Sequence, residues 1–576
     1  MRRSIACSLT LVVLFSVRGI AGEDRLWLVR GGQACVSIVA GSDDDFAAER
    51  LQRGLREATG AKLPIGPAAA GQAVIFLGSG KSNGPLAEAA ARAGLDISPA
   101  SLTDQGYAAR WIHESDKDVL LLAGGGRDGA IHAVADLLNW HLERAGGDAW
   151  IGPLDSREVP RLRYRWLWTW DNRMDWGGPG KAVTVMGGGV YRKQPEAFLV
   201  DYKRCVDFMA DHKFNGLIIW GLLRDVHGGV QAAQELCRYA ARRGVRILPG
   251  VGTSGYAGYY YEGKNIFNAD QWLRQHPELR AIEKGGQPHI EKDGEAHAPQ
   301  FHAAPCPSKK ANQDWLDRGA EWMFKTFQVG GVNLEMGDFF VCYCDECKRA
   351  RAAIASREPD YYKDMAISHM VTLKTMRRLS PEAWLSYATY TGYTAAMMKE
   401  RPKFLAMIPE NALCQWTLTG MAPRWDARIR PMAKHSIGYL HWCNSSTNTA
   451  DDFYLDEVRA ICGNAAGAGL EGLDTYGELS DRQPNAELFY LAWEAFLWRP
   501  EMTRQQFVDT RLSRLYGGPA PAKKLLEIIP LVRTAKDRKN GDNCDRAIEL
   551  AERARSEAAP AGRERWDRLV AMLQRL

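Results

Sequence analysis

The fold is decided by the stretch YRWLWTWDN (residues 164–172), followed by FLVDYKRCVDFMADHK (198–213) and FNGLIIWG (214–221). The first and third segments are short runs of aromatic and aliphatic residues, which is typical of buried strands. The second has apolar residues at helical spacing. The same order continues with VQAAQELCRYAARRG (230–244) and VRILPG (245–250). Alternating strands and helices predict a parallel sheet covered by helices.

Five further segments continue the strand pattern. They are GGVNLEMGDF (330–339), WLSYATYTGY (384–393), NALCQWTLTG (411–420), SIGYLHWCNSS (436–446) and GLEGLDTYGEL (469–479). Eight strands predict an α/β fold, a (β/α)8 TIM barrel over residues 159–486. Mixed strand and helix patterns predict a small N-terminal α/β domain over residues 23–158. Continuous helical spacing predicts a C-terminal helical domain over residues 487–576.

Residues 1–22 have the pattern of a secretory signal peptide. Arg2 and Arg3 precede an apolar run from Ile5 to Val17, and small residues follow it. We therefore expect an exported protein, periplasmic or extracellular, that has no membrane segment after cleavage, because no later stretch is long and apolar enough. The net charge of +5 on 576 residues, with no dense Lys/Arg block, argues against a nucleic-acid partner.

Aromatic and polar residues gather where the predicted barrel strands end, the position of active sites in such barrels. Because sugar rings pack well on aromatic faces, this composition predicts a carbohydrate partner. The candidate substrate-binding residues are Trp168, Trp170, Asp171, Asn172, Arg173, Trp220, Tyr256, Tyr390, Trp416, His441, Trp442 and Tyr476.

Carboxylates at two strand ends predict glycoside hydrolysis, which needs one protonated carboxyl group and one carboxylate. Glu335 follows an apolar strand, where partial burial would raise its pKa toward that of a working general acid. Asp338, three residues later, could orient Glu335 or the substrate. The second carboxylate is Asp474 or Glu478, after the eighth strand, because strands five to seven end without one. No organic cofactor is expected.

Three cysteines, Cys342, Cys344 and Cys347, lie in CYCDECKRA (342–350), and Cys306 precedes them in HAAPCPSKK (302–310). Four thiolates could hold a structural zinc ion in tetrahedral geometry. A disulfide is the alternative in an exported protein. We favour the metal, because three closely spaced cysteines cannot all pair with one another.

The segment RYRWLWTWDNRMDWGGPG (163–180) resembles the first strand of family 67 glycoside hydrolases, the α-glucuronidases, whose Trp-Asp-Asn triplet matches Trp170, Asp171 and Asn172. AAERLQRGLREATGAKLPI (47–65) and LLLAGGGRDGAIHAVADLL (120–138) are similar to their N-terminal domain and to the small domain ahead of β-hexosaminidase barrels. AWEAFLWRPEMTRQQFVDTRLSRLYG (492–517) is similar to the helices after their barrel. CYCDECKRA resembles a group of bacterial barrel proteins that carry C-x-C-x-x-C after strand four.

The resemblance implies an α-glucuronidase-like hydrolase that degrades polysaccharide, with its acid glutamate after strand four, which supports Glu335. Two other hypotheses stay open. One is a barrel that binds carbohydrate without catalysis. The other is a hexosaminidase-like enzyme that uses the acetamido group of its substrate, for which adjacent acids on strand four would be expected.

Overall fold

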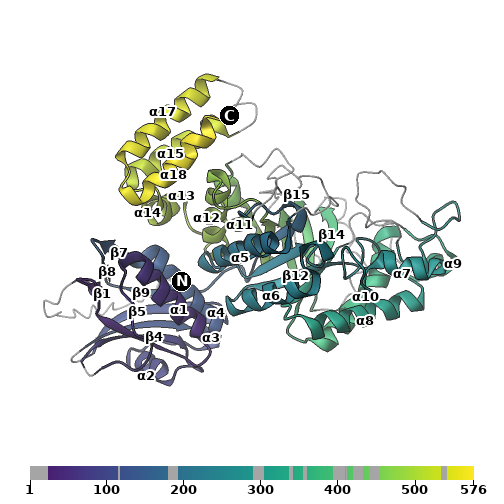
Figure 1. Ribbon diagram of the computed structural model, residues 1–576, viewed down its shortest axis with the longest axis horizontal. Helices are drawn as coiled ribbons and strands as arrows, with labels where there is room; N and C mark the ends of the chain where they lie inside the picture. Colours follow the sequence, from purple (N-terminus) through teal and green to yellow (C-terminus); the bar gives the residue numbers. More distant parts are fainter. Residues whose placement is uncertain are drawn as a thin grey trace, which may run out of the picture.

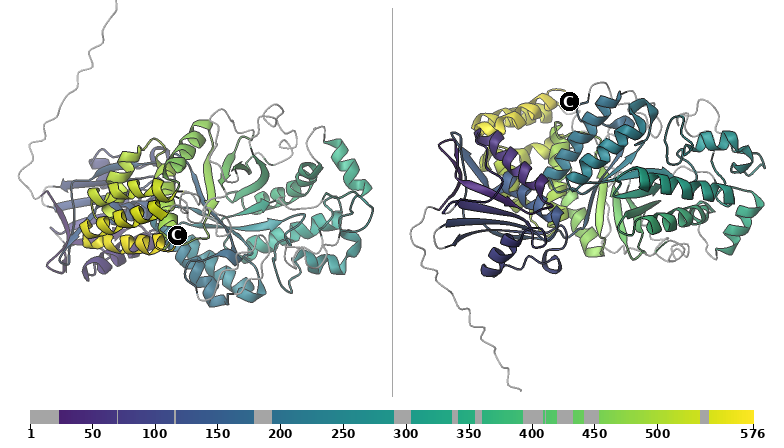
Figure 2. Two further views of the ribbon diagram at one scale, coloured as in Figure 1. Left: turned by 90° about the horizontal axis from the view of Figure 1, so that it is seen from above. Right: turned by 60° about the horizontal axis from the view of Figure 1, so that its bottom comes forward.

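The computed structural model describes residues 24–69, 71–114, 117–178, 193–289, 304–335, 341–354, 360–392, 409, 411–419, 433–440, 453–533 and 541–576. A layered N-terminal unit, a central barrel and a group of C-terminal helices follow one another along the chain (Figure 1). The N-terminal unit and the C-terminal helices lie on the same side of the barrel, as the additional views confirm (Figure 2).

The N-terminal unit contains two sheets. One has the order β3-β4-β6-β5-β9 and the other the order β2-β1-β8-β7. Their strands are β1 Leu26–Arg30, β2 Gln33–Ala34, β3 Val36–Ala40, β4 Ala73–Ser79, β5 Tyr107–Glu114, β6 Lys117–Gly124, β7 Leu142–Ala145, β8 Asp148–Ile151 and β9 Asp155–Glu158. The helices are α1 Asp45–Thr59, α2 Gly84–Arg92, α3 Pro99–Leu102 and α4 Arg127–Asp136.

The second long helix of this unit is shorter than the sequence pattern predicts. Helical spacing over residues 127–146 predicts one helix, but α4 passes into a π-helical turn, η1 Leu137–His141, and the chain then forms β7. Strand β7 pairs antiparallel with β8. The two glycines between these strands have φ values of 58° and 89°. They allow a tight hairpin, and its pairing overrides the helical pattern of residues 142–145.

Within the described residues, eight parallel strands close the predicted barrel in sequence order, with β17 pairing back to β10. The (β/α)8 prediction is confirmed. The strands are β10 Tyr164–Trp170, β11 Gly216–Trp220, β12 Arg246–Gly252, β13 Gly331–Glu335, β14 Trp384–Gly392, β15 Leu413–Thr419, β16 Ser436–Leu440 and β17 Gly472–Tyr476.

Helices follow six of these strands in the described residues. They are α5 Pro195–Asp211, α6 Gly229–Arg242, α8 Lys310–Thr326, α10 Asp360–Leu379, α11 Leu455–Ala468 and α12 Pro484–Trp498. Two shorter helices, α7 Ala269–Gln275 and α9 Asp345–Ala353, lie at the end of the barrel away from the N-terminal unit (Figure 1). Outward strand residues such as Leu167 and Leu217 pack against the helices in one continuous core.

Aromatic rings fill the barrel interior. Tryptophans 166, 168 and 170 alternate along β10 and point inward, where they join rings from other strands. Glycines on neighbouring strands make room for them. A Cβ at Gly216 would lie 2.3 Å from the Trp166 ring, and one at Gly250 would lie 2.3 Å from the Trp220 ring. This alternation of large and small residues explains how so many indoles fit inside one barrel.

The C-terminal helices are α13 Arg504–Phe507, α14 Ser513–Leu515, α15 Pro519–Val532, α17 Gly541–Glu557 and α18 Pro560–Leu573, with a π-helical turn, η8 Val508–Leu512, between the first two. All 15 residues of α12 are buried. Because α12 directly follows the eighth strand, we propose that it is the eighth barrel helix and that the helical unit begins after it. Among the described residues, no helix combines the length and apolarity needed to cross a membrane.

Candidate active site and cysteine cluster

Glu478 lies just beyond the end of the eighth strand and is fully buried. Its carboxylate accepts a hydrogen bond from the backbone N–H of Trp170 (3.2 Å), at the end of the first strand. The guanidinium of Arg173 lies 3.9 Å from the second carboxylate oxygen. These contacts hold Glu478 at the C-terminal end of the barrel, the end at which barrel enzymes carry their active sites.

Asp474 lies deeper in the barrel than Glu478. It faces Trp166 and Tyr439 across the two neighbouring strands and accepts a hydrogen bond from the Gln415 side-chain amide. The Gln415 carbonyl in turn accepts from Asn333 (2.7 Å), and Asn333 accepts from the indole N–H of Trp220 (3.2 Å). Asp474 thus belongs to a hydrogen-bonded belt that crosses the barrel interior.

Glu335 is the last residue of β13, and its backbone pairs with Gly252 of β12. It therefore lies at the same end of the barrel as Glu478, two residues after Asn333 of the polar belt. Tyr390 lies near the end of β14. Asp338, His441 and Trp442 fall outside the described residues.

Five of the predicted sugar-binding aromatics pack together at this end of the barrel. Trp168 contacts Trp170 and Tyr476, and Trp170 contacts Trp220 and Tyr256, with ring centroids 5.0–5.8 Å apart. Each is at most 5% exposed. They form a tightly packed aromatic lining beneath the strand ends.

The backbone after strand three is strained. Tyr256 and Ala257 have φ values of 49° and 61°, in the left-handed region that non-glycine residues rarely adopt. Such strain persists where the surrounding structure enforces it and is concentrated at functional sites. Here the Tyr256 ring is held between Trp170 and Trp220, so strain and packing meet at the aromatic lining.

Asp171, predicted to contact substrate, is the partner of a buried arginine. Its carboxylate lies 2.7 Å from Arg224 Nε and 3.2 Å from a second guanidinium nitrogen. Although burial opposes the charge, the Asp171 carboxylate raises the pKa of Arg224. Asp171 is fully buried, and its ion pair joins the loops after strands one and two; its contact with substrate stays a prediction. The next two residues, Asn172 and Arg173, are also buried.

Trp416, another predicted substrate contact, lies on the outer face of its strand. It packs in the core between the barrel and the helices, and its indole N–H donates to Ser436 Oγ (3.0 Å). Its neighbour Gln415 points into the barrel, and side chains alternate along a strand. The structure thus places Gln415, rather than Trp416, on the inward face of this strand, and the role of Trp416 stays a prediction.

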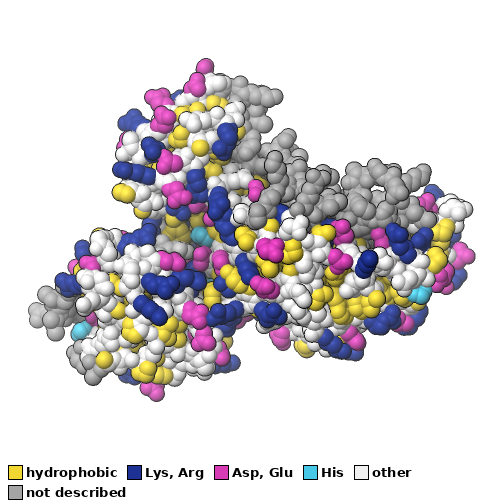
Figure 3. Space-filling view, in the orientation of Figure 1, with side chains coloured by type: hydrophobic (Ala, Val, Ile, Leu, Met, Phe, Trp, Pro, Cys, Tyr) yellow, Lys and Arg dark blue, Asp and Glu magenta, His cyan; other side chains and the backbone are white. Residues whose placement is uncertain are grey.

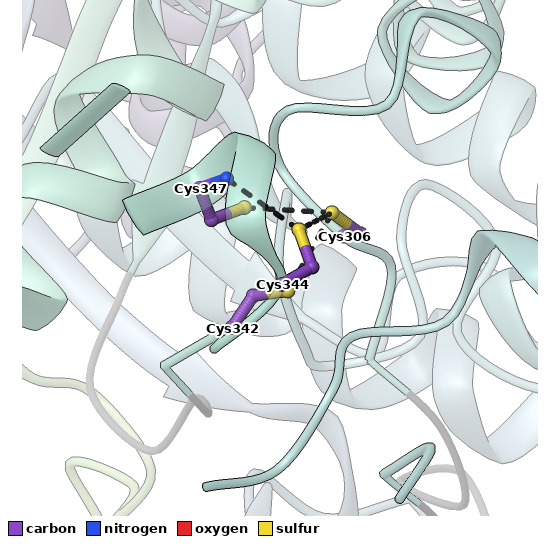
Figure 4. A group of neighbouring side chains, drawn as sticks. All are labelled: Cys306, Cys342, Cys344 and Cys347. Atoms are coloured by element: carbon purple, nitrogen blue, oxygen red, sulfur yellow. Dashed lines mark hydrogen bonds between the residues drawn. The ribbon is translucent and has the colours of Figure 1, made fainter. Parts of the chain in front are cut away.

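The four predicted metal ligands converge, as Figure 4 shows. The sulfur of Cys306 lies 3.5 Å from those of Cys342 and Cys347 and 3.7 Å from that of Cys344. All four ligand atoms lie within 4.8 Å of one another. Zinc–sulfur bonds of about 2.3 Å in a tetrahedron would separate the sulfurs by about 3.8 Å. A disulfide would need about 2.05 Å, and all four cysteines are free. The spacing therefore favours a metal site.

Hydrogen bonds surround the sulfurs. The backbone N–H of Ile282 donates to Cys342 Sγ (3.3 Å), that of Cys347 donates to Cys344 Sγ (3.4 Å), and Ser308 Oγ lies 3.1 Å from Cys347 Sγ. The contact with Cys306 and the Ile282 N–H lower the pKa of Cys342. Outer-shell hydrogen bonds of this kind orient metal ligands, and the two backbone N–H groups donate to the sulfurs. The residues present therefore fit a cation bound by four thiolates.

A buried ion pair anchors the same loop to the barrel helices. Asp364 on α10 accepts hydrogen bonds from the Cys342 backbone N–H (3.0 Å) and from Arg351 (2.6 Å), and Arg351 also donates to the Cys342 carbonyl (2.7 Å). Burial raises the pKa of Asp364 to about 6, against the effect of these donors. The backbone of Cys342 is thus held at both its N–H and its carbonyl.

No protein-family model matches the chain, and no curated protein matches it. Solved structures do. A GH20 exo-β-N-acetylglucosaminidase from Vibrio harveyi is 12% identical over 88% of this chain and 76% of that one, with a TM-score of 0.53. A family GH115 4-O-methyl-α-glucuronidase is 13% identical, with 95% and 71% coverage and a TM-score of 0.57. A GH138 enzyme targeting pectin rhamnogalacturonan II is 12% identical, with 93% and 68% coverage and a TM-score of 0.57.

The chain shares its barrel fold with glycoside hydrolases. At this level of identity the similarity concerns the fold alone. The site itself contains two residues that the sequence did not single out, namely Asn333 and Gln415. Polar residues in otherwise apolar strands were the available signal for both, because a buried polar side chain needs a partner.

Proposed function

We propose that the protein is a glycoside hydrolase with Glu335 as general acid and Glu478 as the second carboxylate. The observation that carries the proposal is the place of these two glutamates. One ends the fourth strand and the other follows the eighth, above an aromatic barrel interior. Sugar-cleaving sites need two carboxyl groups on either side of the scissile bond.

Strands four and eight lie on opposite sides of the closed barrel. A strand spacing of about 4.8 Å and a tilt near 36° give an eight-stranded barrel a backbone diameter of about 15 Å. A barrel of this width has room for a sugar ring and a water molecule between the ends of strands four and eight. We therefore propose inversion of the anomeric carbon, for which separations of roughly 6.5–9.5 Å are typical.

The surroundings of Glu478 support its role as the base. Its carboxylate accepts a hydrogen bond from the Trp170 N–H and lies 3.9 Å from the Arg173 guanidinium, two contacts suited to a carboxylate. An ionised carboxylate can take a proton from the attacking water while Glu335 protonates the leaving oxygen. We assign the deeper Asp474, which Gln415 engages, to holding the belt that includes Asn333.

We further propose that Cys306, Cys342, Cys344 and Cys347 bind one structural zinc ion. Bound zinc would cross-link four thiolates and leave no open coordination position. The cysteines join the loop after strand three to the loop after strand four, and the latter begins at Glu335. The four cysteines would therefore hold the loop that begins at the proposed general acid, Glu335, against the loop after strand three.

Two finer points also remain proposals. The GH115 neighbour is named as an α-glucuronidase, which agrees with the family 67 resemblance of Trp170, Asp171 and Asn172 and supports an α-glucuronidase-like enzyme acting on polysaccharide. The pattern of residues 1–22 supports export.

The test is a screen of aryl glycosides and polysaccharides with the wild type and the Glu335→Gln variant. We expect the variant to lose roughly 10²–10⁴-fold in kcat and to keep its substrate affinity. Proton NMR of the first product should show the inverted anomer. Turnover of N-acetylated glycosides alone would instead indicate the hexosaminidase-like mechanism. Binding without any turnover in the wild type would leave only a carbohydrate-binding protein.

A further inference from the structure

A pocket lies outside the barrel interior, between the loop after strand eight and the last helix, α18. It has a volume of about 460 Å³. Its lining consists of Arg482, Gln483, Pro484, Asn485, Arg568, Ala571, Met572 and Arg575. The three charged residues are all arginines, and no carboxylate of the described part of the chain lines it. The face in Figure 3, by contrast, shows acidic and basic side chains interspersed.

Two of the three guanidinium groups are available to a ligand. Arg482 and Arg575 are exposed, and neither side chain makes a hydrogen bond or an ion pair with any described residue. Arg568 is committed differently: it donates to the Asp481 carbonyl (2.8 Å) and pairs with Glu487 (2.9 Å). The Arg568 guanidinium is therefore held in one position at the edge of the pocket. Arg482 and Arg575 carry positive charge that no described carboxylate neutralises.

The pocket adjoins loops of the proposed active site. Arg482 is four residues after Glu478. Its guanidinium lies beside Gly177 in the loop after strand one, where a Cβ would come within 3.2 Å of it. Asp481 is held by Arg204 (2.5 Å), which also flanks Gly177. A chain that crosses the strand-one and strand-eight side of the barrel mouth would therefore pass the arginines.

We propose that this pocket binds an anionic group, a carboxylate or a sulfate ester, on a part of the polysaccharide remote from the cleaved bond. Planar guanidinium groups bind both oxyanions through paired hydrogen bonds. The inference rests on the proposed function for the identity of the ligand as a saccharide. It adds that the enzyme selects acidic polymers by contacts outside the reacting ring.

The experiment measures binding of the full chain to three probes by affinity electrophoresis: polygalacturonate, dextran sulfate and uncharged dextran. The Arg482→Gln/Arg575→Gln double variant should bind the acidic probe about tenfold more weakly and dextran equally, since each exposed contact contributes modestly. Loss for polygalacturonate alone identifies carboxylate as the ligand, and loss for dextran sulfate alone identifies sulfate.

A matched control removes two exposed cations of the same helical unit away from the pocket, as Lys523→Gln/Arg546→Gln. This variant should change acidic binding less than twofold. Equal losses in both double variants, or no binding of either acidic probe by the wild type, would overturn the proposal. Because binding is read without turnover, an inactive wild type would refute the proposed hydrolase and leave this result intact.

Discussion

The two ends of the barrel use buried charge differently. At the N-terminal end, Lys213 precedes strand two and is 1% exposed; its ammonium lies 2.7 Å from Asp136 of the N-terminal unit and 2.6 Å from Glu494 of α12. It also lies over the Trp498 ring, 4.5 Å from the centroid. At the C-terminal end, the guanidinium of Arg173 lies 3.9 Å from the carboxylate of Glu478.

The comparison distinguishes a buried charge that holds segments of the fold together from one that we propose takes part in catalysis. Lys213 joins three segments distant in sequence, and it does so from a left-handed conformation (φ 59°) that glycine would adopt with less strain. A lysine there is explained by its ion pairs. Glu478 and Arg173 come from adjacent strand ends and keep a looser contact. Barrel enzymes place stability at the N-terminal end and chemistry at the other.

The largest effect is expected for Glu478→Gln. Loss of the proposed base should reduce kcat roughly 10²–10⁴-fold, with KM and Tm little changed. The control is Glu471→Gln at the opposite end of the same strand, where the carboxylate is partly exposed and pairs with His435. Steady-state kinetics on the best substrate checks this. Equal activity of the two variants would contradict the contrast between the barrel ends.

Lys213→Met should lower stability and leave kcat unchanged, which is the opposite of the result expected for Glu478→Gln. It leaves Asp136 and Glu494 buried without their cation, a change that costs about 3–5 kcal/mol of folding free energy. Urea denaturation measures it, and kcat of the remaining folded protein should be unchanged. Lys203→Met, which breaks the more exposed pair with Glu235, should cost less than about 1 kcal/mol. A comparable loss in both would show that burial of the lysine is unimportant.

An intermediate effect, on metal binding, is expected at the cysteine cluster in the loops after strands three and four. Ser308→Ala removes the hydroxyl beside Cys347 and should weaken zinc binding roughly 10–100-fold, and Cys347→Ser should weaken it more. Metal analysis of the purified protein and competition with a chelator measure both. Cys462→Ser, at a buried cysteine outside the cluster, should keep the wild-type metal content. No zinc in the wild type would refute the site.

At neutral pH the smallest effect is expected from a buried histidine of the N-terminal unit, whose contribution to stability changes only in acid. Burial, with nearby Arg165, lowers the pKa of His132 from 6.5 to about 3. The unfolded chain therefore binds one more proton between these values, and stability falls as pH drops from about 6.5 toward 3. His132→Gln keeps a donor for the Gln105 carbonyl. This variant should reduce the slope of the unfolding free energy against pH by up to about 1.4 kcal/mol per pH unit. Superimposable slopes would contradict this.

Some features could be read from the sequence because they depend on neighbouring residues. The strand and helix periods of the barrel and the Gly60 end of α1 are local patterns, and the structure shows them. Cys342, Cys344 and Cys347 are close along the chain, so their convergence was expected. The cluster's fourth member, Cys306, is separated from them by 36 residues and reaches the site only through tertiary contacts.

Other features depend on partners that the local sequence does not specify. Residues 142–145 form a strand because β8 pairs with them. Trp416 faces the helices because its neighbour Gln415 points into the barrel. The Asp171 carboxylate forms an ion pair with Arg224, which lies on a different loop.

The sequence by itself determined which elements form and in which order, because backbone periodicity and capping are local. Only the tertiary structure decided which buried polar groups form hydrogen bonds or ion pairs with one another. Satisfying a buried charge or hydrogen bond requires a partner in space, and that partner can come from any part of the chain.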